Sequence, residues 1–272
     1  MLPNSFGIRD SDLIFLKSAL QSHSDIIPYA RKLQTTNVPR LGTEGTILHQ
    51  ISEGWAGGSI TPQHHLIASA LCCFNNLDYL FDLFESSQKQ GSLQPPIWAI
   101  ASISRSVLVS ASRILYVLLP DDNSVRQTNL RKIHNSNLGS QELFHEAAQD
   151  FEVMANLRDT LEKPNDVPGT KISDTKMTDA AVDYLLNNVY RIDESHSKLF
   201  TEGVRWMWNT WSGLAHGLEW PTRSPNINQE YGYEVIPGVY AINLFVLTTL
   251  ANTAIIECYE AFFGEQDVET DS

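Results

Sequence analysis

The stretch PPIWAIASISRSVLVSASRILYVLLP, residues 95–120, decides the fold class. A proline suits the first turn of a helix and Pro120 ends one, so the stretch predicts a helix from 95 to 119. Its only charged residues are Arg105 and Arg113. A helix that is apolar over most of its circumference is typical of the centre of a core. We therefore expect other helices to surround it.

A second long helix is predicted immediately before this one. Thr61 and Pro62 pair a capping side chain with a proline at the first helical position, which indicates a helix from 62 to about 88. Its apolar residues recur at spacings of four and three, as in antiparallel bundle packing: Leu66, Ala70, Cys73, Leu77, Leu80 and Phe84. The two helices form a predicted hairpin.

Two roles are open for the arginines of the central helix. Folding the hairpin about residue 91 sets Asp78 level with Arg105, so Asp78 and Asp82 are candidate partners in a buried ion network. Alternatively, Arg105 and Arg113 line a pocket and bind an anionic ligand.

The second informative stretch is FTEGVRWMWNTWSGLAHGLEW, residues 200–220, which holds four of the six tryptophans. On a helix, one side collects the apolar residues Phe200, Val204, Met207, Trp211 and Leu214. The opposite side collects a polar strip, with Trp206 and Trp208 toward its edges: Arg205, Asn209, Ser212 and His216. One face is expected to pack and the other to bind or to face solvent.

The polar strip combines a cation, an amide, a hydroxyl and an imidazole. Such groups together can hold a phosphate and move a proton near neutral pH. If the protein is an enzyme, His216, Arg205 and Ser212 are the candidate catalytic residues. The candidate ligand-binding residues are Asn209, Trp206, Trp208, Arg105 and Arg113.

The remaining segments also read as helices and loops, and no strand is convincing. The expected features are a helix at 13–33 bent or restarted at Pro28, a glycine-rich loop at 35–61, a helix at 124–162 broken at Gly139 with Ser140 capping its second piece, a linker at 163–177, a helix at 179–191 capped by Thr178, the Trp-rich helix at 196–217 capped by Asp193 or Ser195, and a last helix at 237–263.

We therefore predict an all-α fold, an antiparallel bundle of about seven helices in a single domain. Residues 1–61 pack on the bundle, residues 62–264 form it, and residues 265–272 are an acidic tail. The central helices are those near 62–88, 95–119, 196–217 and 237–263.

Composition narrows the choice of partners. A net charge of −13 argues against nonspecific DNA binding, which depends on clustered Lys and Arg. The start of the chain lacks the pattern of a secretory signal, so a cytoplasmic location is expected. Residues 235–256 carry no charge and approach the length of a membrane span, but Asn243 and Asn252 are costly in lipid. We interpret this segment as a core helix and expect no membrane contact.

No metal or cofactor is expected. Glu142 and His145 have a metal-ligand spacing, but a di-iron bundle needs a second Glu-x-x-His motif, and the chain has none. The adjacent His64 and His65 point about 100° apart on a helix and lack ligand partners nearby in the sequence. The three cysteines give neither a disulfide framework nor a zinc pattern.

A resemblance to a known group rests on WNTWSGLAHGLEW, on SRSVLVSASRILYVLLP and on the trailing Arg126 and Arg131. Over about residues 62–217, the chain resembles bacterial all-helical proteins with HEPN-like bundles. In HEPN proteins, an arginine followed four to six residues later by a histidine cleaves RNA without metal at a homodimer interface. His216 would match the histidine, whereas Asn209 stands where an arginine is expected. Val109 stands near an expected glutamate.

The resemblance implies a homodimer whose ligand is a nucleotide or RNA. Because the Arg/His pair is incomplete, our leading interpretation is a HEPN-like module that binds a nucleotide, an RNA end or a protein partner at the polar strip. One alternative is a metal-independent HEPN ribonuclease, acting as a toxin or defence effector. The other is a structural dimerisation protein, since Trp and Arg are enriched at interfaces.

Overall fold

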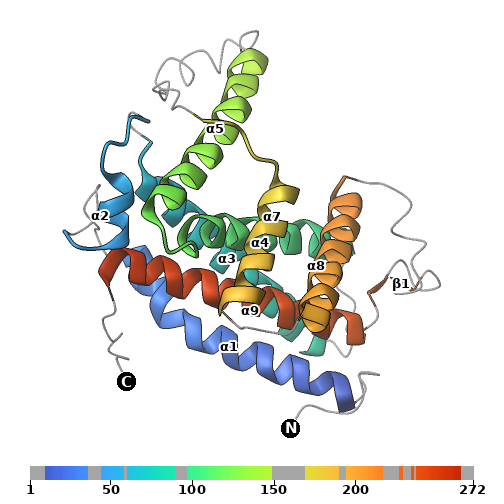
Figure 1. Cartoon of the computed structure of the whole chain (residues 1–272). Coiled ribbons are helices and arrows are strands. Elements are labelled where there is room, and N and C mark those ends of the chain that lie inside the picture. The colour runs from blue at the N-terminus through green and yellow to red at the C-terminus, as the bar shows by residue number, and fades with distance from the viewer. Residues whose placement is uncertain are drawn as a thin grey trace.

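The protein is described from a computed structural model that covers residues 10–35, 44–57, 60–89, 97–148, 169–189, 194–216, 227–228, 234–235 and 237–264. These residues form eight α-helices, one short π-helix and one pair of two-residue strands (Figure 1). The all-helical fold class is confirmed.

The helix α4 (Ile97–Leu118) lies at the centre of the fold. It packs against α3 (Pro62–Lys89), α5 (Asn123–Ala148), α7 (Asp174–Tyr184), α8 (Glu194–Ala215) and α9 (Pro237–Phe263). Its fully buried side chains include Ile100, Val107, Leu108, Ile114 and Leu115. The expectation of a surrounded, core-forming helix is confirmed.

The N-terminal helix α1 (Asp10–Thr35) packs more extensively on α9 than on any other element among the described residues. The ring of Phe15 lies 5.3 Å from that of Phe245, and the ring of Tyr29 lies 5.2 Å from that of Tyr259. Both contacts have the same sequence offset, so α1 and α9 run parallel to each other, as Figure 1 also shows. Antiparallel packing therefore does not extend to this pair.

Several helix boundaries differ from the sequence prediction. The α1 helix continues through Pro28, and α5 continues through Gly139, so Ser140 caps no second piece. The α7 helix begins at Asp174, where Ser173 accepts a hydrogen bond from the Lys176 backbone N–H at 3.4 Å. Thr178, predicted as the cap, is instead buried inside α7.

Other boundaries agree with the prediction or lie outside the described residues. The starts of α3 and α9 agree, and the glycine-rich region contains one short helix, α2 (Ile47–Ser52). The π-helix η2 (Leu185–Val189) extends α7. Ser195 lies within α8 and is not its cap. The proposed cap Asp193, the helix end near Gly217, residues 149–168 and the acidic tail fall outside the described residues.

A short strand pair was not expected. Strand β1 (Ile227–Asn228) pairs antiparallel with β2 (Glu234–Val235), just before α9.

Three helical segments are long and apolar enough to cross a membrane, judged by length and composition: Pro62–Leu83, Trp98–Leu118 and Ala241–Phe263. In this structure all three pack against other helices of the chain. Within α9, Asn243 and Thr248 are buried, and the Thr248 hydroxyl donates to the Leu244 carbonyl at 2.6 Å. The segment thus packs as a core helix here.

Candidate functional site

The Trp-rich helix α8 has the two faces that its sequence predicts. Val204, Met207, Trp211 and Leu214 are buried. On the other side Arg205, Asn209 and His216 are exposed, and Ser212 is partly buried.

The two tryptophans predicted at the edges of the strip differ in their surroundings. Trp206 is 40% exposed. Trp208 is buried; its indole N–H donates to the Thr175 hydroxyl at 3.2 Å, and the Arg105 guanidinium lies 5.1 Å from its ring centroid. Trp208 therefore joins α8 to α7 and α4, and it does not form an exposed edge of the polar strip.

The polar strip does not converge on one point. Arg205 donates from Nε to Asp179 Oδ1 at 2.7 Å, a hydrogen bond that raises the pKa of the guanidinium. Arg205 and His216 are eleven positions apart, which is about 16 Å along a helix axis. A single phosphodiester is too small to contact both.

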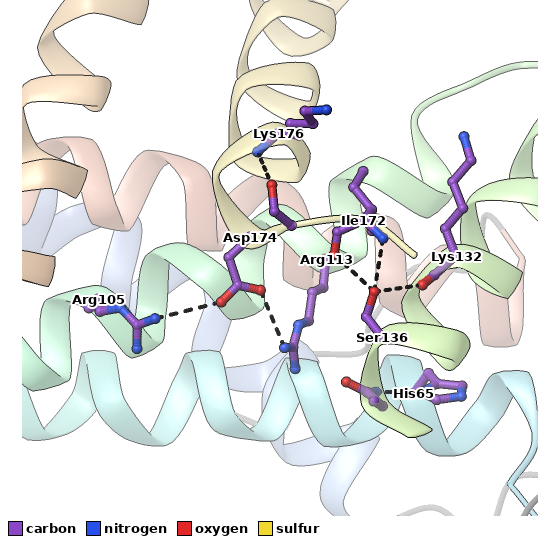
Figure 2. A network of polar contacts seen from close by, with 10 residues as sticks. His65, Arg105, Arg113, Lys132, Ser136, Ile172, Asp174 and Lys176 are labelled. Carbon is purple, nitrogen blue, oxygen red and sulfur yellow. Dashed lines mark hydrogen bonds and ion pairs between the residues drawn. The ribbon is translucent and has the colours of Figure 1, made fainter. Parts of the chain in front are cut away.

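Arg105 and Arg113 share one carboxylate, that of Asp174 at the start of α7. The Nη2 atom of each arginine lies 3.6 Å from one Asp174 oxygen, and Figure 2 shows the carboxylate between the two guanidinium groups. The predicted pairing of Arg105 with Asp78 is wrong. Asp78 instead contacts His23 of α1 at 3.3 Å, because its side of α3 faces α1.

His23 is packed into the α1–α3 interface. Its ring stacks on Phe81 with centroids 4.3 Å apart, and burial lowers its pKa even though Asp78 opposes that shift. Asp78 thus belongs to a structural contact between α1 and α3, away from the arginines.

A pocket of about 350 Å³ opens between α3, α4 and α5. Its lining residues, from all three helices and from the turn before α3, are Ile60, His64, His65, Ala68, Ser69, Cys72, Ser110, Arg113 and Asn137. Arg113 therefore both lines this pocket and pairs with Asp174.

The lining of the pocket is rich in hydrogen-bond donors and contains no carboxylate. Ser69 and Ser110 are buried at 8% and 5% exposure. Both residues line the pocket. A hydroxyl is both a donor and an acceptor of hydrogen bonds, so two hydroxyls on a pocket wall suit a polar ligand.

The two histidines of the pocket are fixed in orientation by neighbouring groups. His64 Nδ1 accepts from the Thr61 backbone N–H at 3.1 Å, which leaves the Nε2 proton as the donor of a neutral ring. His65 Nδ1 contacts the Asn137 amide nitrogen at 3.3 Å, and its Nε2 lies 3.0 Å from His134 Nδ1. The Asn137 donor therefore sets the proton of His65 on Nε2.

His65 stays neutral in this cluster. Burial is the main cause that lowers its pKa to about 3, with smaller contributions from His134, Arg113 and His64. The Trp55 ring also packs edge-on against both His65 and His134. Arg113 supplies a permanent positive charge to the pocket lining.

In the part of the chain that is described, no group of three or more His, Cys, Asp or Glu side chains is arranged to hold a metal ion. The side chains of Glu142 and His145 lie outside the described set.

The pocket as a whole was not predicted from the sequence, although Arg113 was among the predicted ligand-binding residues. One signal was present: His64, Ala68 and Cys72 recur every four residues beside His65 and Ser69, which marks a small and polar stripe on α3. Which other helices face that stripe depends on the packing, and the sequence did not reveal it.

Comparison of the chain with protein-family models, with curated proteins and with solved structures gives no significant match.

Proposed function

We propose that the protein is a noncatalytic, HEPN-like binding module that holds a terminal phosphate in the pocket between α3, α4 and α5. The observation that carries this proposal is the pocket lining: one arginine, two serine hydroxyls and no carboxylate, in a chain of net charge −13. A lining with a cation and no carboxylate suits an anionic ligand, even in so acidic a chain.

The size and chemistry of the pocket define the ligand class. A volume of about 350 Å³ lies at the small end of small-molecule pockets, which span roughly 300–1,000 Å³. Arg113 would pair with the phosphate, since a guanidinium matches phosphate oxygens in a bidentate geometry. Ser69, Ser110 and the His64 Nε2–H would donate further hydrogen bonds. Either a mononucleotide or the phosphorylated end of an RNA carries such a group.

Binding is favoured over RNA cleavage by the geometry of α8. Arg205 is held by Asp179 and lies about 16 Å along the helix from His216, so the two groups of one chain do not act on one phosphodiester. The ribonuclease alternative predicts cleavage in EDTA that His216→Ala abolishes. Intact RNA with both wild-type protein and the variant would contradict that alternative.

The proposal includes a cytoplasmic homodimer. Trp206 is the exposed tryptophan of α8 and is suited to such an interface, whereas Trp208 is buried within the chain. Light scattering of wild-type protein should give the mass of two chains, and Trp206→Ala should shift it toward one. A single-chain mass for the wild type would contradict the dimer.

The ligand proposal is tested by calorimetric titration with AMP, adenosine, inorganic phosphate and a 5′-phosphorylated RNA dinucleotide. AMP and adenosine differ only in the phosphate, so wild-type protein should bind AMP and not adenosine. Inorganic phosphate and the dinucleotide separate recognition of phosphate alone, of a mononucleotide and of an RNA end.

Arg113→Gln should abolish binding of every phosphate-bearing probe. Arg205→Gln is the matched control, because it removes one arginine outside the pocket. Circular dichroism must show that both variants are folded. Absence of binding by wild-type protein, or equal binding by Arg113→Gln, would overturn the proposal.

A further inference from the structure

The Asp174 carboxylate already pairs with Arg113, the arginine of the proposed phosphate site. Arg105 and Arg113 are eight positions apart on α4, about 12 Å along its axis, yet each lies beside one of the two oxygens of this carboxylate (Figure 2). Two positive charges thus face one negative charge. The cationic group that lines the pocket is already shared with an anion of the chain itself.

The contact is an ion pair without a hydrogen bond. Both arginine–carboxylate distances are 3.6 Å, whereas a charge-assisted hydrogen bond measures about 2.7–2.9 Å. On the same helix, Asp179 reaches that range with Arg205 at 2.7 Å. Asp174 therefore partly offsets the positive potential at Arg113 but makes no hydrogen bond that would fix its orientation. The Nε atom of Arg105 also has no hydrogen-bond partner among the described residues.

The backbone holds Asp174 in this position. Residues 169–173 lie along α5, where the Asn135 side chain donates to the Gly169 carbonyl at 3.1 Å and Ile172 N–H donates to the Ser136 hydroxyl at 2.9 Å. Figure 2 shows this contact of Ser136 with Ile172 next to the arginines. Buried Met177, Ala181 and Val182 anchor the helix that follows.

Asp174 lies at the N-terminal end of α7 and is partly exposed to solvent. It is the first residue of the helix, where the helix dipole favours a negative charge. The Arg113 side chain is 33% exposed, so a competing anion can reach its guanidinium from solvent.

We propose that Asp174 is an internal competitor that limits the affinity of the pocket for phosphate. The carboxylate and the ligand phosphate share the Arg113 guanidinium, and binding requires the phosphate to weaken the Arg113–Asp174 pair. This inference rests on the proposed function, because it assigns a specific affinity-limiting residue to the same site.

The test is the affinity of Asp174→Asn for AMP, measured by calorimetry on the full chain. Partly exposed ion pairs contribute about 0.2–1 kcal/mol, so loss of the competitor should raise the affinity about 1.4- to fivefold. Asp179→Asn is the matched control: it removes the same charge from the same helix but frees Arg205 instead of Arg113. Its affinity for AMP should stay at the wild-type value.

Asp174→Ser provides a second variant without the carboxylate, should the asparagine variant fold poorly. If wild-type protein binds AMP and the folded Asp174 variants bind it with unchanged or lower affinity, the competitor role alone is overturned. A lower affinity would instead indicate that the Asp174 carboxylate positions Arg113. Binding by neither wild-type protein nor the Asp174 variants would overturn the proposed function and the competitor role together.

Discussion

Replacing His65 with glutamine should make the stability of the fold less sensitive to acid. The pKa of His65 is about 3 in the folded chain, against 6.5 for an unperturbed histidine. Between these values the unfolded chain binds a proton that the folded chain does not bind. The contribution of neutral His65 is therefore fully present above pH 6.5 and is lost as the pH falls toward 3.

The expected magnitude follows from the two pKa values. Linkage gives a loss of about 2 kcal/mol in the free energy of unfolding between pH 8 and pH 5 from this residue alone. The figure is set mainly by the unfolded-state pKa, because a folded-state pKa near 3 leaves His65 neutral at pH 5. Glutamine does not titrate, and its amide can still donate to His134 as His65 Nε2 does.

Urea denaturation followed by circular dichroism at pH 8 and pH 5 measures the effect. The difference between the two pH values should be about 2 kcal/mol smaller in His65→Gln than in wild-type protein. The lowered pKa of His23 acts with the same sign in both proteins and cancels in the comparison. His216→Gln, an exposed substitution outside the pocket, should not flatten the profile. If the free energy of unfolding changed equally between pH 8 and pH 5 in wild-type protein and in His65→Gln, the argument that His65 is buried and neutral would be refuted.

Two further predictions concern the packing of α4 and the contact between α7 and α8. Leu115→Ala removes a fully buried side chain from the central helix, so urea denaturation should show a loss of about 2–5 kcal/mol; a loss below about 1 kcal/mol would contradict the central position of α4. A double-mutant cycle of Arg205→Gln and Asp179→Asn should give a coupling below about 1 kcal/mol, because the pair lies at the surface; a larger coupling would mark it as part of the core.

The faces of individual helices could be predicted from the sequence because periodicity depends only on local geometry. The apolar side of α8 and the central role of α4 follow from spacing and from the scarcity of charge. The position of Asp78 could not be predicted in this way. The level of Asp78 along the α3–α4 hairpin follows from local sequence spacing. The helix that faces Asp78 is α1, which is remote in the sequence, so spacing does not reveal it.

Errors at helix ends have local causes. Gly139 is tolerated inside α5, because one glycine costs a helix only about 0.5–1 kcal/mol, which packing can offset. The start of α7 was misplaced because KISDTKM has the composition of a linker. Ser173 caps the helix there, and buried Met177 and Thr178 anchor its first turns. The same error hid Asp174 as a partner of the two arginines.

The position of Asp174 separates a structural role of the α4 arginines from a ligand-binding one. If the arginines served only to hold α7 on α4, the chain would gain most from short hydrogen bonds, as Arg205 and Asp179 form at 2.7 Å. At 3.6 Å and with all three side chains about one-third exposed, the Asp174 pairs should contribute little to stability. Asp174→Asn should therefore change phosphate affinity while leaving the urea midpoint nearly unchanged. A large loss of stability with unchanged affinity would assign the arginines to the scaffold.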